Sequence, residues 1–156
     1  SVYVFRTSDG GAKYGQVAKL TAADARSGDG FGCAVAIDGD TVVVGVHYDD
    51  DAGTSSGSAY VFRTDDGGAT YVEVAKLTAS DAASMDFFGA SVAIDGNTIV
   101  VGATKDDDGG TDSGSAYVFE DESGWWDYFS SDAATRALPS AAILLAAAAV
   151  LAAILA

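Results

Sequence analysis

The sequence predicts an all-β protein made of repeated four-stranded antiparallel sheets. The first observation is an internal repeat: residues 2–58 align without a gap with residues 59–115, and 39 of the 57 paired positions are identical. The second is the pattern inside each copy, where short apolar or alternating runs are separated by turns rich in Gly and Asp. The third is that helical spacing of apolar residues is absent before residue 130.

Each period of the repeat contains signals for four strands. The apolar runs at residues 91–94 and 98–102 flank an Asp-Gly-Asn turn at 95–97, which tolerates the positive φ of a tight hairpin. An Asp/Gly/Ser loop follows and leads into a third strand at residues 114–119. The fourth strand is illustrated by residues 71–77, where apolar and charged residues alternate as in a half-exposed strand.

A four-stranded sheet repeated at this period is typical of a β-propeller blade. A solenoid is the competing architecture, but four antiparallel strands per unit favour a blade. The chain begins inside a strand, so we interpret it as two strands of one blade, a whole blade, and three strands of another, with a final strand expected at residues 125–129. We predict a partial β-propeller over residues 1–129, an incomplete ring whose further blades come from missing N-terminal sequence.

Motifs that recur in register resemble the FG-GAP repeat of integrin α-subunit propellers. They are Phe-Gly-Ala-Ser-Val-Ala at residues 88–93, Ile-Val-Val-Gly-Ala at 99–103 and Gly-Ser-Ala-Tyr-Val-Phe at 114–119. The resemblance covers residues 1–120 and implies a propeller with a binding role. It also implies a calcium loop between the first two strands of a blade. That connection is only a tight turn here, so the usual calcium site of the family is expected to be absent.

An acidic run lies instead in the loop between the second and third strands. Asp106, Asp108 and Asp112 match the alternating spacing of a calcium loop, and Asp49 and Asp51 are poorer equivalents in the first copy. We therefore name Ca²⁺ as a candidate ligand of these five residues. The alternative is a solvated acidic turn whose Asp side chains cap backbone N–H groups. The resemblance places this loop on the face that integrins use for ligand contact.

The overall charge excludes one class of partner. The chain has 23 acidic and 8 basic residues and a net charge of -15, so its surface repels phosphate backbones and nucleic-acid binding is not expected. A solvated acidic surface, a divalent-cation binder and a salt-adapted protein all fit this charge.

Side chains for catalysis are also missing. The only cysteine, Cys33, lies in an apolar strand, and the only histidine, His47, has no second histidine or cysteine as a partner. The carboxylates lie in Gly-rich loops expected to be exposed, where nothing is expected to raise a pKa. The chain is therefore predicted not to be an enzyme.

The composition changes abruptly after residue 129. Residues 130–140 form a small, polar spacer, and residues 141–156 are uninterrupted apolar residues, predicted to form a hydrophobic helix that attaches the protein to a membrane. With no basic residue after the apolar run, the tail fits a GPI-attachment signal, with Ser130, Ser131 and Asp132 as candidate attachment positions. A single C-terminal transmembrane helix is the alternative.

These features together predict a membrane-attached, extracellular binding or adhesion module at the cell surface. Its acidic propeller loops would be presented to a protein or glycan partner. An accessory propeller of a larger extracellular enzyme and a structural cell-wall or surface-layer protein are the alternatives.

Overall fold

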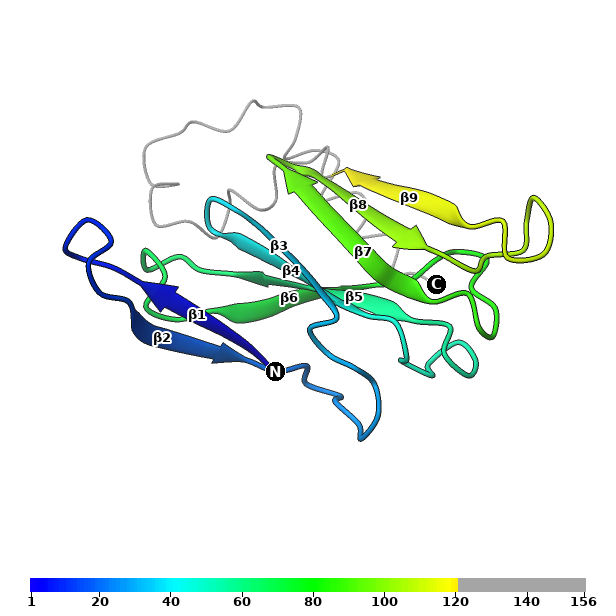
Figure 1. The fold of residues 1–156 in the computed structure, drawn as a ribbon, viewed down its shortest axis with the longest axis horizontal. Coiled ribbons are helices and arrows are strands. Elements are labelled where there is room, and N and C mark those ends of the chain that lie inside the picture. Colours follow the sequence, from blue (N-terminus) through cyan, green and yellow to red (C-terminus); the bar gives the residue numbers. More distant parts are fainter. Residues whose placement is uncertain (121–156) are drawn as a thin grey trace, which may run out of the picture. The chain divides into compact units, whose positions relative to one another are not determined.

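The computed structural model describes residues 1–120, which form β-strands and no helix (Figure 1). The strands are β1 (Val2–Arg6), β2 (Gly15–Leu20), β3 (Ala34–Asp38), β4 (Thr41–Val46), β5 (Ser58–Arg63), β6 (Val72–Leu77), β7 (Phe88–Asp95), β8 (Thr98–Ala103) and β9 (Ser115–Glu120). Within this part of the chain, no helix is long and apolar enough to cross a membrane.

Several predictions concern residues outside the described part of the chain. They are the final strand at 125–129, the spacer at 130–140, the hydrophobic helix at 141–156, and the lipid-attachment candidates Ser130, Ser131 and Asp132.

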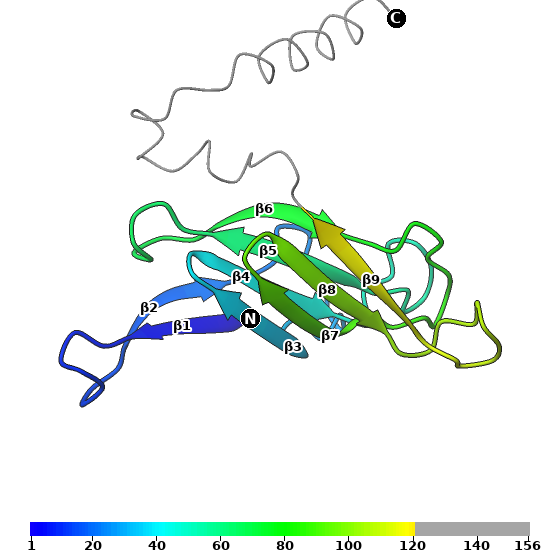
Figure 2. The same cartoon turned by 90° about the horizontal axis from the view of Figure 1, so that it is seen from above.

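The strands pair into three antiparallel sheets, β1-β2, β3-β4-β5-β6 and β7-β8-β9 (Figures 1 and 2). This confirms the all-β prediction and the strand grouping of two, four and three. The hairpins β3–β4 and β7–β8 close with two-residue turns, because Asp38 pairs with Thr41 and Asp95 pairs with Thr98. The glycine that follows each Asp has a φ of 51° or 55°, the left-handed conformation that such turns require.

One cluster of the core lies between the first and second sheets. Strand β4 is buried on both faces, as expected for a continuous apolar run in a central strand. The side chains of one β4 face pack with residues from β2, β5 and the segment after β2; this cluster comprises Leu20, Ala22, Val42, Val44, Val46, Tyr60 and Phe62. On the opposite face Val43 is also fully buried, and β4 contacts β7 of the third sheet.

The second and third sheets meet through close backbone contacts. Gly57 forms a parallel bridge with Phe88, whose N–H donates to Ser56 O at 3.0 Å. A Cβ on Gly57 would overlap Phe88 O, and a Cβ on Gly45 would overlap Gly89 O. These glycines therefore allow the chain at the start of β7 to approach β4 and β5 more closely than any side chain would permit.

Replacing Gly57 with alanine is expected to lower the free energy of unfolding by about 2–3 kcal/mol. Gly57 has a φ of 85°, and its Cβ would also lie 2.7 Å from Phe88 N. Gly67→Ala is the matched control, because Gly67 has a φ of 69° with nothing within 4 Å. The control should lose only about 1 kcal/mol, the cost of placing an alanine in a left-handed backbone conformation. Urea unfolding of the full chain measures both, and equal losses would rule out a packing role for Gly57.

Candidate functional site

Acidic side chains gather at equivalent places in the second and third sheets. Asp24, from the segment between β2 and β3, meets Asp49 and Asp51 from the β4–β5 loop; we name these three residues the first acidic cluster. The second acidic cluster comprises the equivalent residues one repeat later, Asp81, Asp106 and Asp108. In each cluster one carboxylate oxygen from every member lies within 4.8 Å of the others.

Hydrogen bonds within each loop determine where the carboxylates point. In the first loop Asp51 N donates to Asp49 Oδ1 at 3.0 Å, and Gly57 N donates to Asp49 O at 2.9 Å. In the second loop Asp108 N donates to Asp106 Oδ1 and Gly114 N to Asp106 O, both at 2.9 Å. Asp49 and Asp106 therefore have one carboxylate oxygen bonded to the loop and a second that faces the cluster.

A tyrosine from the third strand of each sheet links two carboxylates of its cluster. The Tyr60 hydroxyl lies 2.6 Å from Asp24 Oδ1 and 2.9 Å from Asp49 Oδ2. The Tyr117 hydroxyl lies 2.8 Å from Asp81 Oδ1 and 2.6 Å from Asp106 Oδ2. Burial and these negatively charged acceptors raise the pKa of both tyrosines.

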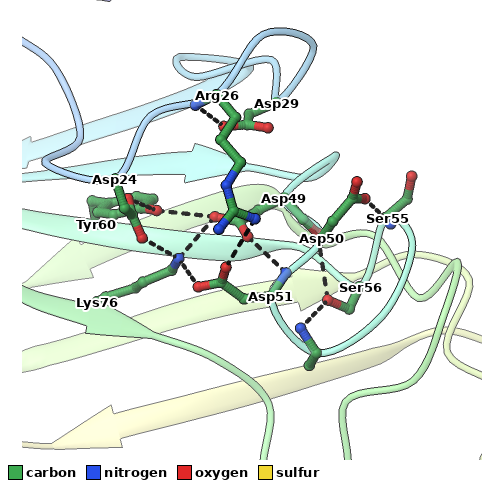
Figure 3. Close-up of polar contacts among 11 residues, drawn as sticks. Asp24, Arg26, Asp29, Asp49, Asp50, Asp51, Ser55, Ser56, Tyr60 and Lys76 are labelled. Carbon is green, nitrogen blue, oxygen red and sulfur yellow. Dashed lines mark hydrogen bonds and ion pairs between the residues drawn. The ribbon is translucent and has the colours of Figure 1, made fainter.

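Lys76 supplies a positive charge to the first acidic cluster (Figure 3). Its Nζ atom comes from β6 and lies 2.7 Å from Asp24 Oδ2 and 3.0 Å from Asp49 Oδ2, and it also contacts Asp51 Oδ2. Arg26 adds a longer contact of 3.6 Å to Asp51. The ammonium thus contacts all three carboxylates, in the place that a bound cation would take.

The charges of the first acidic cluster are mutually stabilised. Hydrogen bonds from Lys76 and Tyr60 hold the pKa of Asp24 below its usual value. Burial alone would raise the pKa of Asp49, but the hydrogen bonds that Asp49 accepts outweigh it and the pKa is lowered. Burial likewise opposes the charged form of Lys76, yet its hydrogen bonds to Asp24 and Asp51 raise the pKa of the ammonium group.

The second acidic cluster lacks such a cation within residues 1–120. No lysine or arginine of this part of the chain forms an ion pair with its carboxylates, and Ala83 stands one repeat after Arg26. Repulsion from Asp106 and Asp81 raises the pKa of Asp108. The expectation that nothing in these loops raises a pKa was therefore wrong, because folding brings like charges from separate segments together.

The structure groups the predicted cation ligands differently from their spacing in the sequence. Asp49 with Asp51, and Asp106 with Asp108, do come together. Asp112 does not join the second acidic cluster: it has a φ of 52°, and its N–H donates to Asp107 Oδ1 at 2.6 Å. The Asp side chains of this loop accept hydrogen bonds from its backbone N–H groups, as the alternative of a solvated acidic turn predicts.

The sequence interpretation missed the residues that other segments contribute to the clusters. These are Asp24 and Asp81, the two tyrosine hydroxyls, and Lys76. Asp81 repeats Asp24, Tyr117 repeats Tyr60, and Lys76 repeats Lys19, each one period later. This recurrence is the signal that could have identified them.

The FG-GAP repeat family matches the chain twice, over residues 14–62 and 65–119. The two matches cover more than half of the sequence. The chain belongs to the FG-GAP repeat family. A search of curated proteins found no match to this chain. FG-GAP repeats indicate a propeller-type extracellular or adhesion-like module.

The FG-GAP matches also show how the first acidic cluster is assembled. Asp24, Asp49 and Asp51 all lie in the first FG-GAP repeat, whereas Lys76 lies in the second. A lysine of one repeat therefore supplies a counter-charge to the acidic cluster of the repeat before it.

Proposed function

We propose that this chain is a non-enzymatic recognition module at the cell surface, part of a propeller, and that its second acidic cluster binds cationic groups of a protein partner. FG-GAP repeats support the adhesion-like role. The net charge of -15 supports a basic partner, because long-range attraction raises association rates for oppositely charged molecules.

The observation that carries the proposal is the difference between the two acidic clusters. The first has three carboxylates in ion pairs with Lys76 and Arg26, whereas within residues 1–120 no lysine or arginine forms an ion pair with the three carboxylates of the second; Lys105, next to Asp106 in the chain, lies over the Phe87 ring. Asp81 and Asp108 are exposed, so a ligand from solvent has access to them. A cationic group placed there would relieve the repulsion that raises the pKa of Asp108.

Ca²⁺ is a second candidate for the same position. Hard divalent cations take several oxygen ligands, and the second acidic cluster offers three carboxylates within 4.8 Å of one another. Water or oxygen groups of a partner would supply the remaining ligands, and in the second case the calcium ion would bridge the two molecules. Asp81, Asp106 and Asp108 would hold the ion, in place of the set with Asp112 that spacing alone predicts.

Binding of oligolysine to the immobilised full chain tests the proposal. We expect salt-sensitive binding, since solvent-exposed charges are screened by salt. The double variant Asp81→Asn/Asp108→Asn should weaken binding about tenfold, which is the loss of roughly one charge-assisted contact. Calcium added at constant ionic strength should compete with oligolysine, because both ligands need the same carboxylates.

The double variant Asp40→Asn/Asp65→Asn is the matched control. It removes two exposed charges from the β3–β4 turn and the β5–β6 loop. Asn97 already occupies the position equivalent to Asp40 in the second copy, so the fold should tolerate the change. Equal weakening in the two double variants would mean that oligolysine senses only the net charge, and the proposed role of the second acidic cluster would be wrong.

A further inference from the structure

Asp-Gly pairs in a protein chain can rearrange without an enzyme. The glycine nitrogen attacks the carboxyl carbon of the aspartate, and the reaction is favoured because glycine has no Cβ to crowd that nitrogen or restrict the backbone. Within residues 1–120 the sequence has six such pairs, which begin at Asp9, Asp29, Asp38, Asp66, Asp95 and Asp108. The structure shows which pairs the fold protects and which it leaves free to react.

Hydrogen bonds hold the carboxylates of four pairs in place. Asp66 is the clearest case, because its two oxygens accept four hydrogen bonds of 2.6–2.9 Å from Thr64, Ala69 and Thr70. Donors at 2.6–3.0 Å also hold three others, Asp9, Asp29 and Asp38. These bonds must break before the carboxyl carbon can approach the glycine nitrogen, so they slow the reaction.

In the fifth pair it is the glycine nitrogen that is engaged. Gly96 lies in the β7–β8 turn, and its N–H donates to Asp38 Oδ2 at 2.6 Å. Asp95 and Thr98 pair with each other on the two sides of this turn. The nitrogen is therefore directed toward a different carboxylate, and the sheet holds the backbone on both sides of it.

The sixth pair, Asp108 with Gly109, has neither kind of protection. Both residues are exposed in the β8–β9 loop, and no N–H or hydroxyl group of residues 1–120 donates a hydrogen bond to the Asp108 carboxylate. Gly109 N–H makes only a long bond of 3.2 Å to Ser113 Oγ. Carboxylate oxygens of Asp81 and Asp106 lie within 4.8 Å of one from Asp108, so loss of the Asp108 charge would relieve repulsion.

We propose that Asp108-Gly109 is a site of spontaneous aspartate isomerisation, which removes a carboxylate from the second acidic cluster as the protein ages. Gly109 N bonds to Asp108 Cγ and gives up its proton, and one carboxylate oxygen leaves as water with that proton and a second one from solvent. The product is an uncharged succinimide ring. Water then breaks the bond between Asp108 C and Gly109 N, which releases a proton and leaves an isoaspartate whose main chain runs through Cγ.

The isomerisation changes the loop at the second acidic cluster alone. The main chain gains one carbon between residues 108 and 109, and the new carboxylate is attached directly to Cα, away from its original place. The first acidic cluster is spared, because Ala52 follows Asp51 and the ammonium group of Lys76 holds the Asp51 carboxylate. The inference goes beyond the proposed function and does not depend on it.

Ageing of the full chain at neutral pH and body temperature tests the inference. Trypsin cuts after Lys105 and Arg136, so the peptide 106–136 contains a single Asp-Gly pair, and peptides 64–76 and 77–105 contain the pairs at Asp66 and Asp95. Electron-transfer mass spectrometry should find isoaspartate forming at Asp108 about tenfold faster than at the other two, because their hydrogen bonds add to the barrier.

The same measurement in denaturant is the control for the role of the fold. There the three sites should react at similar rates, because no hydrogen bond then protects any of them. Equal rates in the folded chain would overturn the proposal.

Gly109→Ala is the matched variant, because it introduces the alanine that the first copy of the repeat has at position 52. Ala52 N–H makes a 3.2 Å hydrogen bond to Ser56 Oγ, as Gly109 N–H does to Ser113 Oγ, so the loop should tolerate the change. Isoaspartate at residue 108 should then form about tenfold more slowly, since a Cβ crowds the attacking nitrogen and raises the barrier. An unchanged rate would contradict attack by this nitrogen.

Ala52→Gly is the converse variant and places a glycine after Asp51. Isomerisation at Asp51 should stay slow, because Lys76 and Arg26 form ion pairs with its carboxylate. A rate as fast as that at Asp108 would show that local sequence, and not the protection given by the fold, controls the reaction.

Oligolysine binding to the aged protein separates this inference from the proposed function. Isoaspartate at residue 108 with a parallel loss of oligolysine binding supports both. Isoaspartate with unchanged binding supports the isomerisation and contradicts the binding role of the second acidic cluster. If no isoaspartate forms at residue 108, the isomerisation is wrong and the proposed function stands.

Discussion

Replacing Phe88 with alanine is expected to lower the free energy of unfolding by about 3–5 kcal/mol, the usual cost of removing a buried phenylalanine. Phe88 is fully buried where the second and third sheets meet. Its ring lies 5.4 Å from that of Tyr117 and 6.1 Å from that of Phe119, in edge-to-face arrangements. The substitution would leave a cavity at the start of β7 and remove the ring that packs against Tyr117, whose hydroxyl bonds the second acidic cluster.

Phe31→Ala provides the matched comparison for this effect. Phe31 occupies the equivalent position in the first copy and contacts Tyr60 and Phe62 at 5.8 Å and 6.1 Å between ring centres. It is only half-buried, so its loss should cost about 1–2 kcal/mol. Guanidinium unfolding of the full chain, followed by circular dichroism, measures both variants. A loss for Phe88→Ala no larger than that for Phe31→Ala would contradict the central packing role of Phe88.

Replacing Lys76 with methionine is expected to destabilise the protein by about 2–3 kcal/mol at pH 7. Removing one partner of a buried ion pair leaves uncompensated charge and can cost more than this. The effect is reduced here because the side chains of Asp24 and Asp51 are 42% and 39% exposed and are partly screened by water. Asp49, with a side chain that is only 6% exposed, should dominate the loss.

The pH dependence of the Lys76→Met variant gives a sharper test than its stability at one pH. In the wild type, the lowered pKa values of Asp24 and Asp49 stabilise the fold above their unfolded value of 3.8, and this contribution is lost as pH falls through the folded values. The raised pKa of Lys76 stabilises the fold below 10.5, and that contribution is lost as pH rises through the folded value.

In the Lys76→Met variant the three carboxylates repel one another, and only the longer Arg26 contact to Asp51 remains as a counter-charge. Their folded pKa values should rise above the unfolded ones, so the folded state binds protons more readily and stability increases as pH falls from 7 toward 4. The difference from the wild type should therefore shrink over that range. A difference that stays constant with pH would show that Lys76 acts through packing of its aliphatic chain instead of its charge.

Lys19→Met is the internal control for this experiment. Lys19 occupies the equivalent position in β2, where it lies 5.8 Å from the ring of Tyr3. Within residues 1–120 it forms no ion pair with a carboxylate. Its replacement should change stability by less than about 0.5 kcal/mol, as is usual for an exposed substitution away from special contacts.

The sequence by itself determined the secondary structure and the family. The 57-residue repeat, the tight turns at Asp38 and Asp95, and the alternating runs specify strands because each is a local property of the chain. Grouping the strands into sheets of two, four and three followed from the repeat without any knowledge of long-range contacts. The acidic loop positions Asp49, Asp51, Asp106 and Asp108 were found by spacing alone.

Only the tertiary structure decided which charges meet. Asp24 and Asp81 are far from the acidic loops in the sequence, and Lys76 belongs to the following repeat, so no local pattern links them to Asp49 or Asp106. Side-chain electrostatics depends on distances of a few ångströms, which pairing and packing of separate strands determine. For that reason the two acidic clusters differ in their counter-charge although their loops have nearly the same sequence. Strand β6 brings a lysine to the first acidic cluster, and no strand of residues 1–120 brings one to the second.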